Sequence, residues 1–274
     1  VAADGRAWLA ATRAAVLDAL AAAGGEAAGA DLARAVPALQ VKVTVDEDKA
    51  WGRDVTLTSQ LLNGLSADGA IVRGRPRGSW VSSQYRWAAT DDWLPGGLPE
   101  RPLLEARAEL VRRYLTAFGP ASVTDVRWWT GWMKGATTAL AALDLVDVEL
   151  DDGPGIALAD DLAPTRRPQP WAALLPALDP TMMGWSERDW YLGEHRPALF
   201  DRSGNAGPTV WWEGRVVGGW AQRPAGDVVF RLLEDVGAEA TAAVEAEAAR
   251  VTALTDGVRP IPKFRTPLER ELSA

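Results

Sequence analysis

The segment from Asp54 to Trp87 most constrains how this chain can fold. Its pattern predicts a helix over Val55–Ser66, followed by a hairpin whose strands are Ala70–Gly74 and Trp80–Trp87. The hairpin carries several arginines and no carboxylate, although the chain has a formal net charge of -8. A helix followed by a basic hairpin is the order of a winged helix, in which the helix faces the DNA major groove and the wing contacts the backbone or the minor groove.

We therefore expect this segment to contact an anion, and double-stranded DNA is the anion that the order of elements favours. The alternative is that the arginines only solvate an exposed turn, because charge on an exposed strand discourages pairing with other strands. The candidate contact residues are polar side chains of the predicted helix and hairpin: Thr56, Thr58, Gln60, Arg73, Arg75, Arg77, Gln84 and Arg86.

The composition excludes several other kinds of site. The chain has no cysteine, so disulfides, thiol nucleophiles and cysteine metal centres are excluded. His195 is the single histidine, which leaves room neither for a histidine-rich metal centre nor for a mechanism that uses two histidines. We therefore expect no metal and no cofactor.

The apolar stretches of the chain are interrupted before they reach the length of a membrane span. The longest are Ala7–Ala23 and Val210–Trp220, and charged residues or glycine break both of them. We expect no membrane contact, a cytoplasmic location and a monomer. The chain starts at Val1 without a methionine or a signal-peptide pattern, so we also expect it to be part of a longer protein.

The first predicted unit covers residues 1–95. Helical periodicity predicts helices over Asp4–Gly24 and Gly29–Val36, and the second of them ends before a proline. Alternating valines predict a strand over Leu39–Val45, and Asp54 is a candidate N-cap for the next helix. Helices followed by the basic hairpin again give the order of a winged helix.

The second predicted unit covers residues 96–165 and repeats this scheme after a linker rich in proline and glycine. Ser122 is the expected N-cap of its middle helix. Its hairpin is acidic, so we expect it to pack or to act as a spacer rather than to bind DNA. The predicted elements are helices over Leu103–Phe118, Val123–Trp132 and Lys134–Leu143, and a hairpin of Val146–Leu150 with Gly155–Leu158.

The third predicted unit covers residues 166–274 and has a different character. A long helix is expected over Glu234–Thr255, and a final turn over Pro267–Leu272. The predicted strands are Leu174–Leu178, Thr209–Glu213, Arg215–Ala221 and Asp227–Leu232, the middle two joined by a tight turn at Glu213-Gly214. The predicted fold class is therefore α+β, with tandem winged-helix units followed by a C-terminal mixed unit that contains an antiparallel sheet.

The loop Asp201–Thr209 and the hairpin that follows it hold a second group of polar residues. Glycine and proline in this loop can bring the backbone close to phosphate, so further candidate DNA contacts are Arg202, Asn205, Arg215 and Arg223. The alternative is a hydrogen-bonded turn in which Asp201 and Asn205 satisfy backbone groups. The 14 tryptophans could stack on nucleobases, but most are expected in a core or in packing between units, because adjacent ones point in different directions and at least one of each pair must be buried.

Several strings in the sequence resemble the AlkZ/YcaQ-like family of bacterial winged-helix DNA glycosylases. In the first unit these strings are Lys49-Ala50-Trp51-Gly52, Leu65-Ser66-Ala67-Asp68-Gly69, Ile71-Val72-Arg73-Gly74 and Arg86-Trp87-Ala88. In the third unit they are Leu174-Leu175-Pro176 with Asp179-Pro180, Ala198-Leu199-Phe200-Asp201-Arg202, Gly204-Asn205-Ala206-Gly207-Pro208-Thr209, and Gly214-Arg215-Val216-Val217-Gly218-Gly219-Trp220. The last group is the most specific, and together the strings cover most of the chain.

The resemblance implies a monofunctional glycosylase that removes alkylated purines, including bulky or crosslinked N7-alkyl adducts. Such an enzyme would serve base-excision repair or self-resistance to DNA-alkylating antibiotics. The family assigns its chemistry to a glutamine–aliphatic–glutamine motif in an N-terminal winged helix, and Gln40-Val41-Lys42 is the nearest string here. It falls in another unit and lacks the second glutamine, so the catalytic residues stay unknown and the motif is expected outside this chain.

Two other functions remain open at this point. The first is a DNA-binding regulator without catalytic activity. The second is a protein-interaction scaffold, because a chain with a pI of 4.9 is repelled by a polyanion unless its positive charge is clustered.

Overall fold

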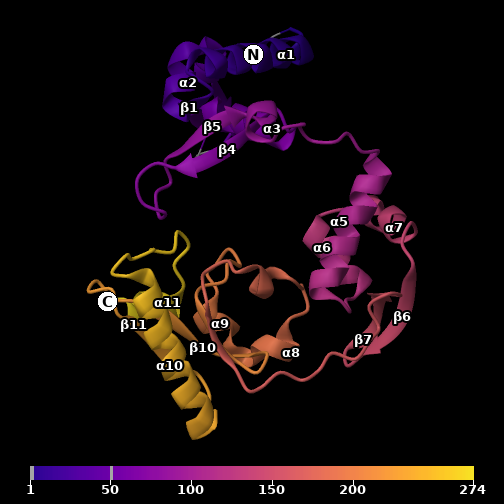
Figure 1. Ribbon diagram of the computed structural model, residues 1–274, viewed down its shortest axis with the longest axis vertical. Helices are drawn as coiled ribbons and strands as arrows, with labels where there is room; N and C mark the ends of the chain where they lie inside the picture. Colours follow the sequence, from indigo (N-terminus) through magenta and orange to yellow (C-terminus); the bar gives the residue numbers. More distant parts are fainter. Residues whose placement is uncertain (1–2, 50–51) are drawn as a thin grey trace. The chain divides into compact units, whose positions relative to one another are not determined.

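The computed structural model describes residues 3–49 and 52–274 of the chain. Its internal contacts divide the chain into two units, Val1–Glu100 and Arg101–Ala274 (Figure 1). Ala50 and Trp51, which belong to one of the family-like strings, lie outside the described residues.

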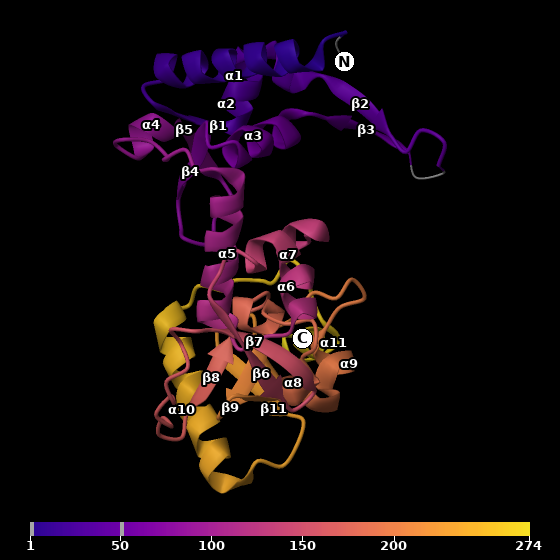
Figure 2. The ribbon, with the colours of Figure 1, turned by 90° about the vertical axis from the view of Figure 1, so that its right-hand side faces the viewer.

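The first unit combines short helices with two small antiparallel sheets. Strand β1 (Glu26–Ala28) lies at the edge of a sheet of order β1-β5-β4, and β2 (Lys42–Val45) pairs with β3 (Arg53–Thr56) in a separate hairpin (Figure 2). The other elements are α1 (Gly5–Ala22), α2 (Gly29–Ala35), η1 (Pro37–Gln40), α3 (Thr58–Ala67), β4 (Ile71–Pro76), β5 (Tyr85–Ala89) and α4 (Thr90–Trp93).

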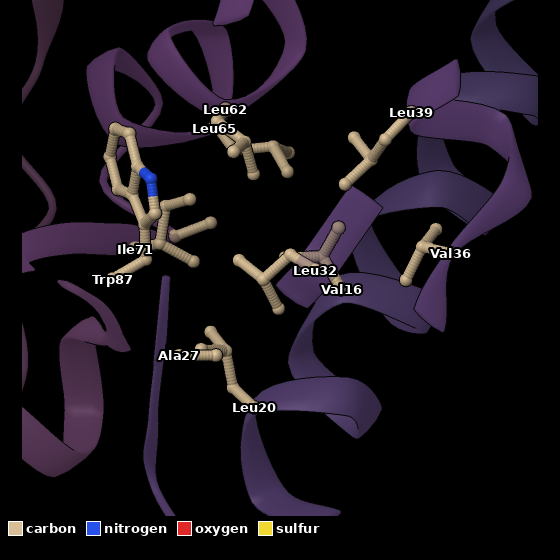
Figure 3. Packing of buried hydrophobic residues seen from close by; sticks show 11 residues of the cluster. Val16, Leu20, Ala27, Leu32, Val36, Leu39, Leu62, Leu65, Ile71 and Trp87 are labelled. Atoms are coloured by element: carbon tan, nitrogen blue, oxygen red, sulfur yellow. The ribbon is translucent and has the colours of Figure 1, made fainter. Parts of the chain in front are cut away.

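The core of the first unit forms where α1, α2 and α3 meet the sheet (Figure 3). Apolar side chains at helical spacing, such as Val16 and Leu20 on α1, lie on one face and are fully buried. They pack in one cluster with Leu32, Leu62 and Ile71. Burial of these side chains holds the helices against the sheet, because each is worth about 1.5–3 kcal/mol relative to an exposed one.

Three predictions in this unit are wrong. The helix predicted from Val55 begins at Thr58, because residues 53–56 pair with 42–45 in the β2–β3 ladder. Asp54 therefore caps no helix, and its carboxylate accepts a 2.8 Å hydrogen bond from Thr44 Oγ1. The strand predicted from Leu39 begins at Lys42, because the residues before it form the turn η1.

The basic hairpin is also longer at its tip than predicted. The sequence predicts strands over Ala70–Gly74 and Trp80–Trp87, whereas the strands pair only as far as Pro76 and Tyr85, with an irregularity between Arg73 and Pro76. The Arg77 N–H then donates to the Gln84 carbonyl oxygen at 2.6 Å and closes the loop of residues 77–84, hereafter the wing tip.

The first part of the second unit follows the predicted order of elements. It contains α5 (Leu103–Phe118), α6 (Val123–Thr130), α7 (Lys134–Leu140), β6 (Leu145–Leu150) and β7 (Gly153–Leu158). Ser122 caps α6 as predicted, and it shares a capping box with Asp125. Reciprocal side-chain bonds of this kind satisfy backbone groups that the first helical turn leaves without partners.

The rest of the second unit is built on an antiparallel sheet of order β11-β10-β9-β8. Strand β10 is buried at nearly every position, because one hydrophobic cluster covers each of its faces. The elements are β8 (Ala172–Leu175), η2 (Pro180–Met183), α8 (Asp189–Leu192), η3 (Gly193–His195), α9 (Arg196–Leu199), β9 (Thr209–Trp212), β10 (Arg215–Gln222), β11 (Val228–Leu232), α10 (Gly237–Thr255) and α11 (Pro267–Leu272). The predicted strands and long helix are present with shifted ends, and β8 stops before Pro176, which cannot donate to a ladder.

Hydrogen bonds join the two parts of the second unit. The Tyr114 hydroxyl donates to the Gly184 carbonyl at 2.9 Å, and Trp185 Nε1 donates to the Phe118 carbonyl at 3.0 Å. Residues 101–165 therefore share packing with later residues, and their treatment as a separate domain stays a prediction. In the described part of the chain, no helix is long and apolar enough to cross a membrane.

Candidate nucleic-acid interface

A groove on the first unit gathers several of the predicted contact residues. It has a volume of about 670 Å³ and lies between the start of α2, one side of α3, and the hairpin of β4 and β5. Thr58, Arg77 and Gln84, all predicted from the sequence, line it. The remaining polar lining comes from Asp31, Ser59, Asn63, Ser83 and Tyr85.

The Arg73 side chain is exposed, but its guanidinium contacts other residues of the unit. Its guanidinium lies 4.5 Å from the ring centre of Tyr85 and 5.4 Å from that of Trp87. Its Nη2 also donates a 2.6 Å hydrogen bond to Asn63 Oδ1 on α3. Cation–π contact and the hydrogen bond thus join the wing to the helix beside it.

Arg75 and Arg77 differ from Arg73 in their contacts. Both side chains are exposed, and no ion pair of either is found within residues 3–49 and 52–274. Gly78 adopts φ of 81°, a left-handed conformation that lets the chain turn directly after Arg77. The two positive charges therefore project from the wing without a carboxylate to neutralise them.

Arg86 and Asp31 modify the charge around the groove. Arg86 lies 3.6 Å from Glu26 across the β1–β5 ladder, and both side chains are partly exposed. Asp31 lines the groove, and Arg34, one turn later in α2, pairs with it. The groove itself is thus close to neutral, and its uncompensated positive charge lies at the wing.

The other predicted contact residues near α3 do not lie together. The Thr58 hydroxyl donates to the Leu39 carbonyl at 2.7 Å, so it is already engaged. Gln60 lies outside the groove and lines a different hollow, between α1 and α3. Thr56 is not on the helix, because it belongs to β3.

Two polar groove residues on α3 were not predicted, although helical spacing could have indicated them. Ser59 and Asn63 are four residues apart and therefore lie on the same face of α3. Gln40, from the string nearest to the family's catalytic motif, donates through Nε2 to the Ala33 carbonyl at 2.7 Å and supports the turn after α2.

In the second unit, the loop that begins at Asp201 is a hydrogen-bonded turn. The Asp201 carboxylate accepts bonds from the backbone N–H groups of Ser203 and Asn205 at 2.8 and 2.9 Å, and from Asn205 Nδ2 at 2.8 Å. The Asn205 side chain and these backbone donors lower the pKa of Asp201. The carboxylate is thus ionised and used locally, as the turn interpretation expects.

The candidate arginines of the second unit differ in their pairing. Arg215 lies 3.6 Å from Glu234, which also contacts His195 Nε2 at 3.3 Å. Arg223 lies 3.6 Å from Asp227. Arg202 is exposed beside the Asp201 turn. Exposed pairs of this kind are weak, but they reduce the charge that Arg215 and Arg223 offer to another anion.

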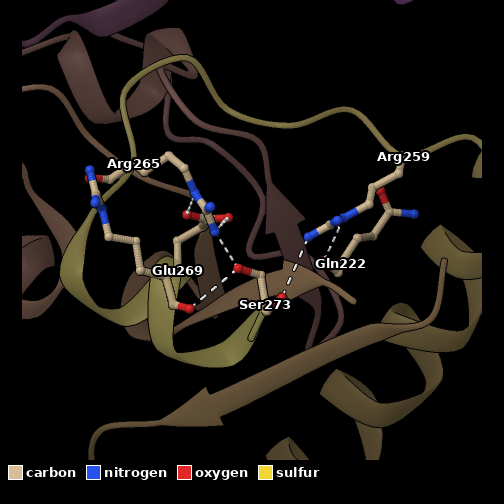
Figure 4. A network of polar contacts seen from close by, with 6 residues as sticks. Gln222, Arg259, Arg265, Glu269 and Ser273 are labelled. Carbon is tan, nitrogen blue, oxygen red and sulfur yellow. Dashed lines mark hydrogen bonds and ion pairs between the residues drawn. The ribbon is translucent and has the colours of Figure 1, made fainter. Parts of the chain in front are cut away.

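A partly buried ion pair anchors the last helix of the second unit (Figure 4). Arg265 donates to both carboxylate oxygens of Glu269, at 2.6 and 3.0 Å, and also to the Ser273 hydroxyl. Arg259 Nε donates to the Gln222 carbonyl at 3.1 Å, which ties the preceding segment to β10. Arg265 and Glu269 neutralise each other, and these contacts therefore support the fold.

The tryptophans only partly follow the expectation that most lie in a core. Trp87, Trp211 and Trp220 are buried, whereas Trp128 and Trp129 are both partly exposed, against the prediction that one of each adjacent pair is buried. Both rings contact other side chains: the Arg188 guanidinium lies over the Trp128 ring, and the Tyr114 ring packs against the Trp129 ring with ring centres 4.9 Å apart. No cluster of carboxylates and histidine suited to a metal occurs among residues 3–49 and 52–274.

The chain is similar to known proteins in sequence and in structure. A model of the family described as DNA glycosylase AlkZ-like matches residues 1–254. Streptomyces sahachiroi DNA glycosylase AlkZ has a similar structure, with a TM-score of 0.61 and 23% sequence identity over 92% of this chain and 74% of that chain. A search of curated proteins gave no match. Since the family model spans nearly the whole sequence, the chain belongs to the AlkZ-like DNA glycosylase family.

Proposed function

We propose that the first unit is a winged-helix module that binds duplex DNA through its groove and wing. The observation that carries this proposal is the pair of exposed wing arginines, Arg75 and Arg77, of which Arg77 lines a groove that also holds hydroxyl and amide side chains. Arginines contact phosphates, while hydroxyl and amide groups donate to and accept from phosphates and base edges.

The net charge of -8 does not prevent this contact. At physiological salt, charges are screened beyond a Debye length of about 8 Å, so a phosphate at the wing responds mainly to nearby arginines. The acidic residues of the second unit's hairpin, Asp147, Glu149, Asp151 and Asp152, favour a different role for α5 to β7. We propose that this second helix–hairpin group is also a winged helix, and that it packs or acts as a spacer.

The family suggests the reaction that DNA binding would serve. We propose that the chain is the DNA-binding part of a monofunctional glycosylase that excises alkylated purines, such as bulky or crosslinked N7-alkyl adducts, in repair or self-resistance. An N7-alkylated purine is cationic and leaves without much acid assistance. The enzyme must therefore chiefly position a water molecule and stabilise the positive charge that develops on the sugar.

The binding proposal is tested by the salt dependence of affinity. Replacing Arg75 and Arg77 together by alanine removes up to two phosphate contacts, and each contact contributes about 0.9 to the slope of log K against log salt. We expect the double variant to bind a plain duplex more weakly, with a slope smaller by about 1.8 in fluorescence anisotropy titrations.

A matched control is the double variant Arg6→Ala, Arg13→Ala, which loses the same charge from exposed positions of α1. It should keep the affinity and the slope of the unaltered chain. If the two double variants behave alike, the wing is ordinary solvated surface. Binding of DNA by the unaltered chain would then favour the regulator alternative, and absence of binding would favour the scaffold alternative.

A second arm measures release of 7-methylguanine from an alkylated duplex. We expect the chain to bind this duplex and to release the base slowly or not at all, because Gln40-Val41-Lys42 lacks the second glutamine and Gln40 supports a turn. Fast release would place catalysis within residues 1–274, and Asp201→Asn would then be the first variant to assay.

A further inference from the structure

The wing tip exposes a large aromatic side chain. Trp80 is 61% exposed and its neighbour Val81 is 42% exposed, although the surrounding loop is ordered by local bonds. The Ser82 N–H donates to the Ser79 carbonyl at 3.0 Å, and the Gln84 N–H donates to the Ser82 hydroxyl at 3.1 Å. The loop therefore forms a defined turn with the indole on its outside.

Two buried tryptophans, in contrast, form hydrogen bonds within the fold. Trp211 Nε1 donates to the Thr209 hydroxyl at 2.9 Å, and Trp220 Nε1 donates to the Leu175 carbonyl at 2.8 Å. Those rings contribute burial and hydrogen bonds to the fold. Exposed apolar surface at Trp80 contributes little to folding stability, since the favourable term is proportional to the apolar area removed from water.

The position of Trp80 on the same loop as two exposed arginines indicates its partner. It follows Arg75 and Arg77, which are exposed, so a phosphate backbone attracted to the wing brings bases within reach of the ring. Bases stack on aromatic faces largely without regard to sequence, and proteins that bind the minor groove insert apolar side chains between base steps and partly unstack them.

We propose that Trp80 is a base-stacking wedge, which enters the duplex at the wing and holds a base step open. This inference rests on the proposed function, because it needs the wing to lie on DNA. The arginines supply affinity for the backbone, and the indole replaces the stacking that a base loses when the duplex is opened.

The test uses the full chain and a duplex that contains 2-aminopurine, whose fluorescence rises when its neighbours unstack. We expect the unaltered chain to raise this fluorescence on binding. Trp80→Ala should abolish the rise and weaken binding about tenfold, within the range measured for single base–aromatic stacks. Trp80→Phe keeps an aromatic face and should restore most of both signals.

The salt slope separates stacking from charge. Trp80 is neutral and releases no counterions, so Trp80→Ala should leave the slope unchanged, whereas the Arg75, Arg77 double variant should lower it. Trp171→Ala, at a partly exposed position of the second unit, is the matched tryptophan control and should change neither signal. Thermal unfolding of Trp80→Ala should match the unaltered chain, because the side chain is exposed.

The outcomes distinguish this inference from the proposed function. If the unaltered chain does not bind DNA, both fail. If it binds with the expected slope while Trp80→Ala binds equally well and still raises the fluorescence, the wedge is wrong and DNA binding by the wing stands. A fall in the slope for Trp80→Ala would also overturn the wedge, because the indole would then only position the arginines.

Discussion

At the scale of single residues, Asp125 shows how a buried charge can serve the fold. It is 3% exposed, and its carboxylate accepts bonds from the Ser122 hydroxyl at 2.8 Å and from the Ser186 N–H and hydroxyl at 2.8 and 2.9 Å. Burial acts to raise the pKa of Asp125, but these hydrogen bonds outweigh it, and the pKa is lowered. The residue therefore joins α6 to the segment around Ser186 in its ionised form.

We expect Asp125→Ala to lower the free energy of unfolding of the second unit by about 2–4 kcal/mol, because several buried donors lose a charged acceptor. The folded-state pKa lies below the unfolded value of about 3.9, so this stabilisation is fully present above that value and is lost as pH falls through the folded-state pKa. The difference in stability between the two proteins should therefore shrink below about pH 4 in denaturant titrations.

Asp161→Asn is the control for this variant, because Asp161 is an exposed carboxylate of the same unit. It should change stability little at any pH. A difference between Asp125→Ala and the unaltered chain that stayed constant down to pH 2 would contradict the role of the ionised carboxylate.

At the scale of elements, the contact between α3 and the wing depends on Arg73. The sequence groups Arg73 with Arg75 and Arg77, but the structure separates them, because Arg73 contacts Tyr85, Trp87 and Asn63 within the unit. A guanidinium held in this way stabilises the β4–β5 hairpin against the helix.

We expect Arg73→Met to lower the stability of the first unit by about 1 kcal/mol, through loss of the cation–π contact and one hydrogen bond. The salt slope of DNA binding should change little, in contrast to the Arg75, Arg77 variant. Thermal unfolding and anisotropy titrations measure the two effects. A drop in the slope of about 0.9 with unchanged stability would instead assign Arg73 to a phosphate.

At the scale of the whole molecule, each unit has its own hydrophobic core. Among residues 3–49 and 52–274, the core of Val1–Glu100 contains no residue of the second unit, and the segment across the boundary between the units, residues 94–102, is rich in proline and glycine. Units with separate cores and a linker of this composition commonly fold independently.

We expect a fragment of residues 1–100 to fold alone, to unfold cooperatively and to keep the salt slope of DNA binding shown by the full chain. Circular dichroism and dispersed amide signals in NMR spectra would establish the fold, and anisotropy would establish the binding. A fragment that is unfolded, or that is folded but has lost the slope, would show that the second unit completes the first or contributes the phosphate contacts.

Elements whose signals are local could be predicted from the sequence. The amphipathic pattern predicts Leu103–Phe118 with the bounds of α5, and Ser122 as an N-cap predicts the start of α6. The turn Glu213-Gly214 is likewise present between β9 and β10. Helical periodicity, caps and tight turns depend on neighbours in the sequence, so they can be predicted without knowledge of the fold.

The tertiary structure alone decided the features that depend on distant partners. Strand β1 is three residues long and exists because β5 pairs with it, and β3 is a strand because residues 42–45 lie beside it. The exposure of Arg75 and Arg77 could be predicted from their hairpin, and the hydrogen-bonded turn at Asp201 from its residue types, but the groove and the contacts of Arg73 could not. Hydrogen-bond and packing partners far apart in the sequence leave no periodic pattern, because they are selected only when the whole chain folds.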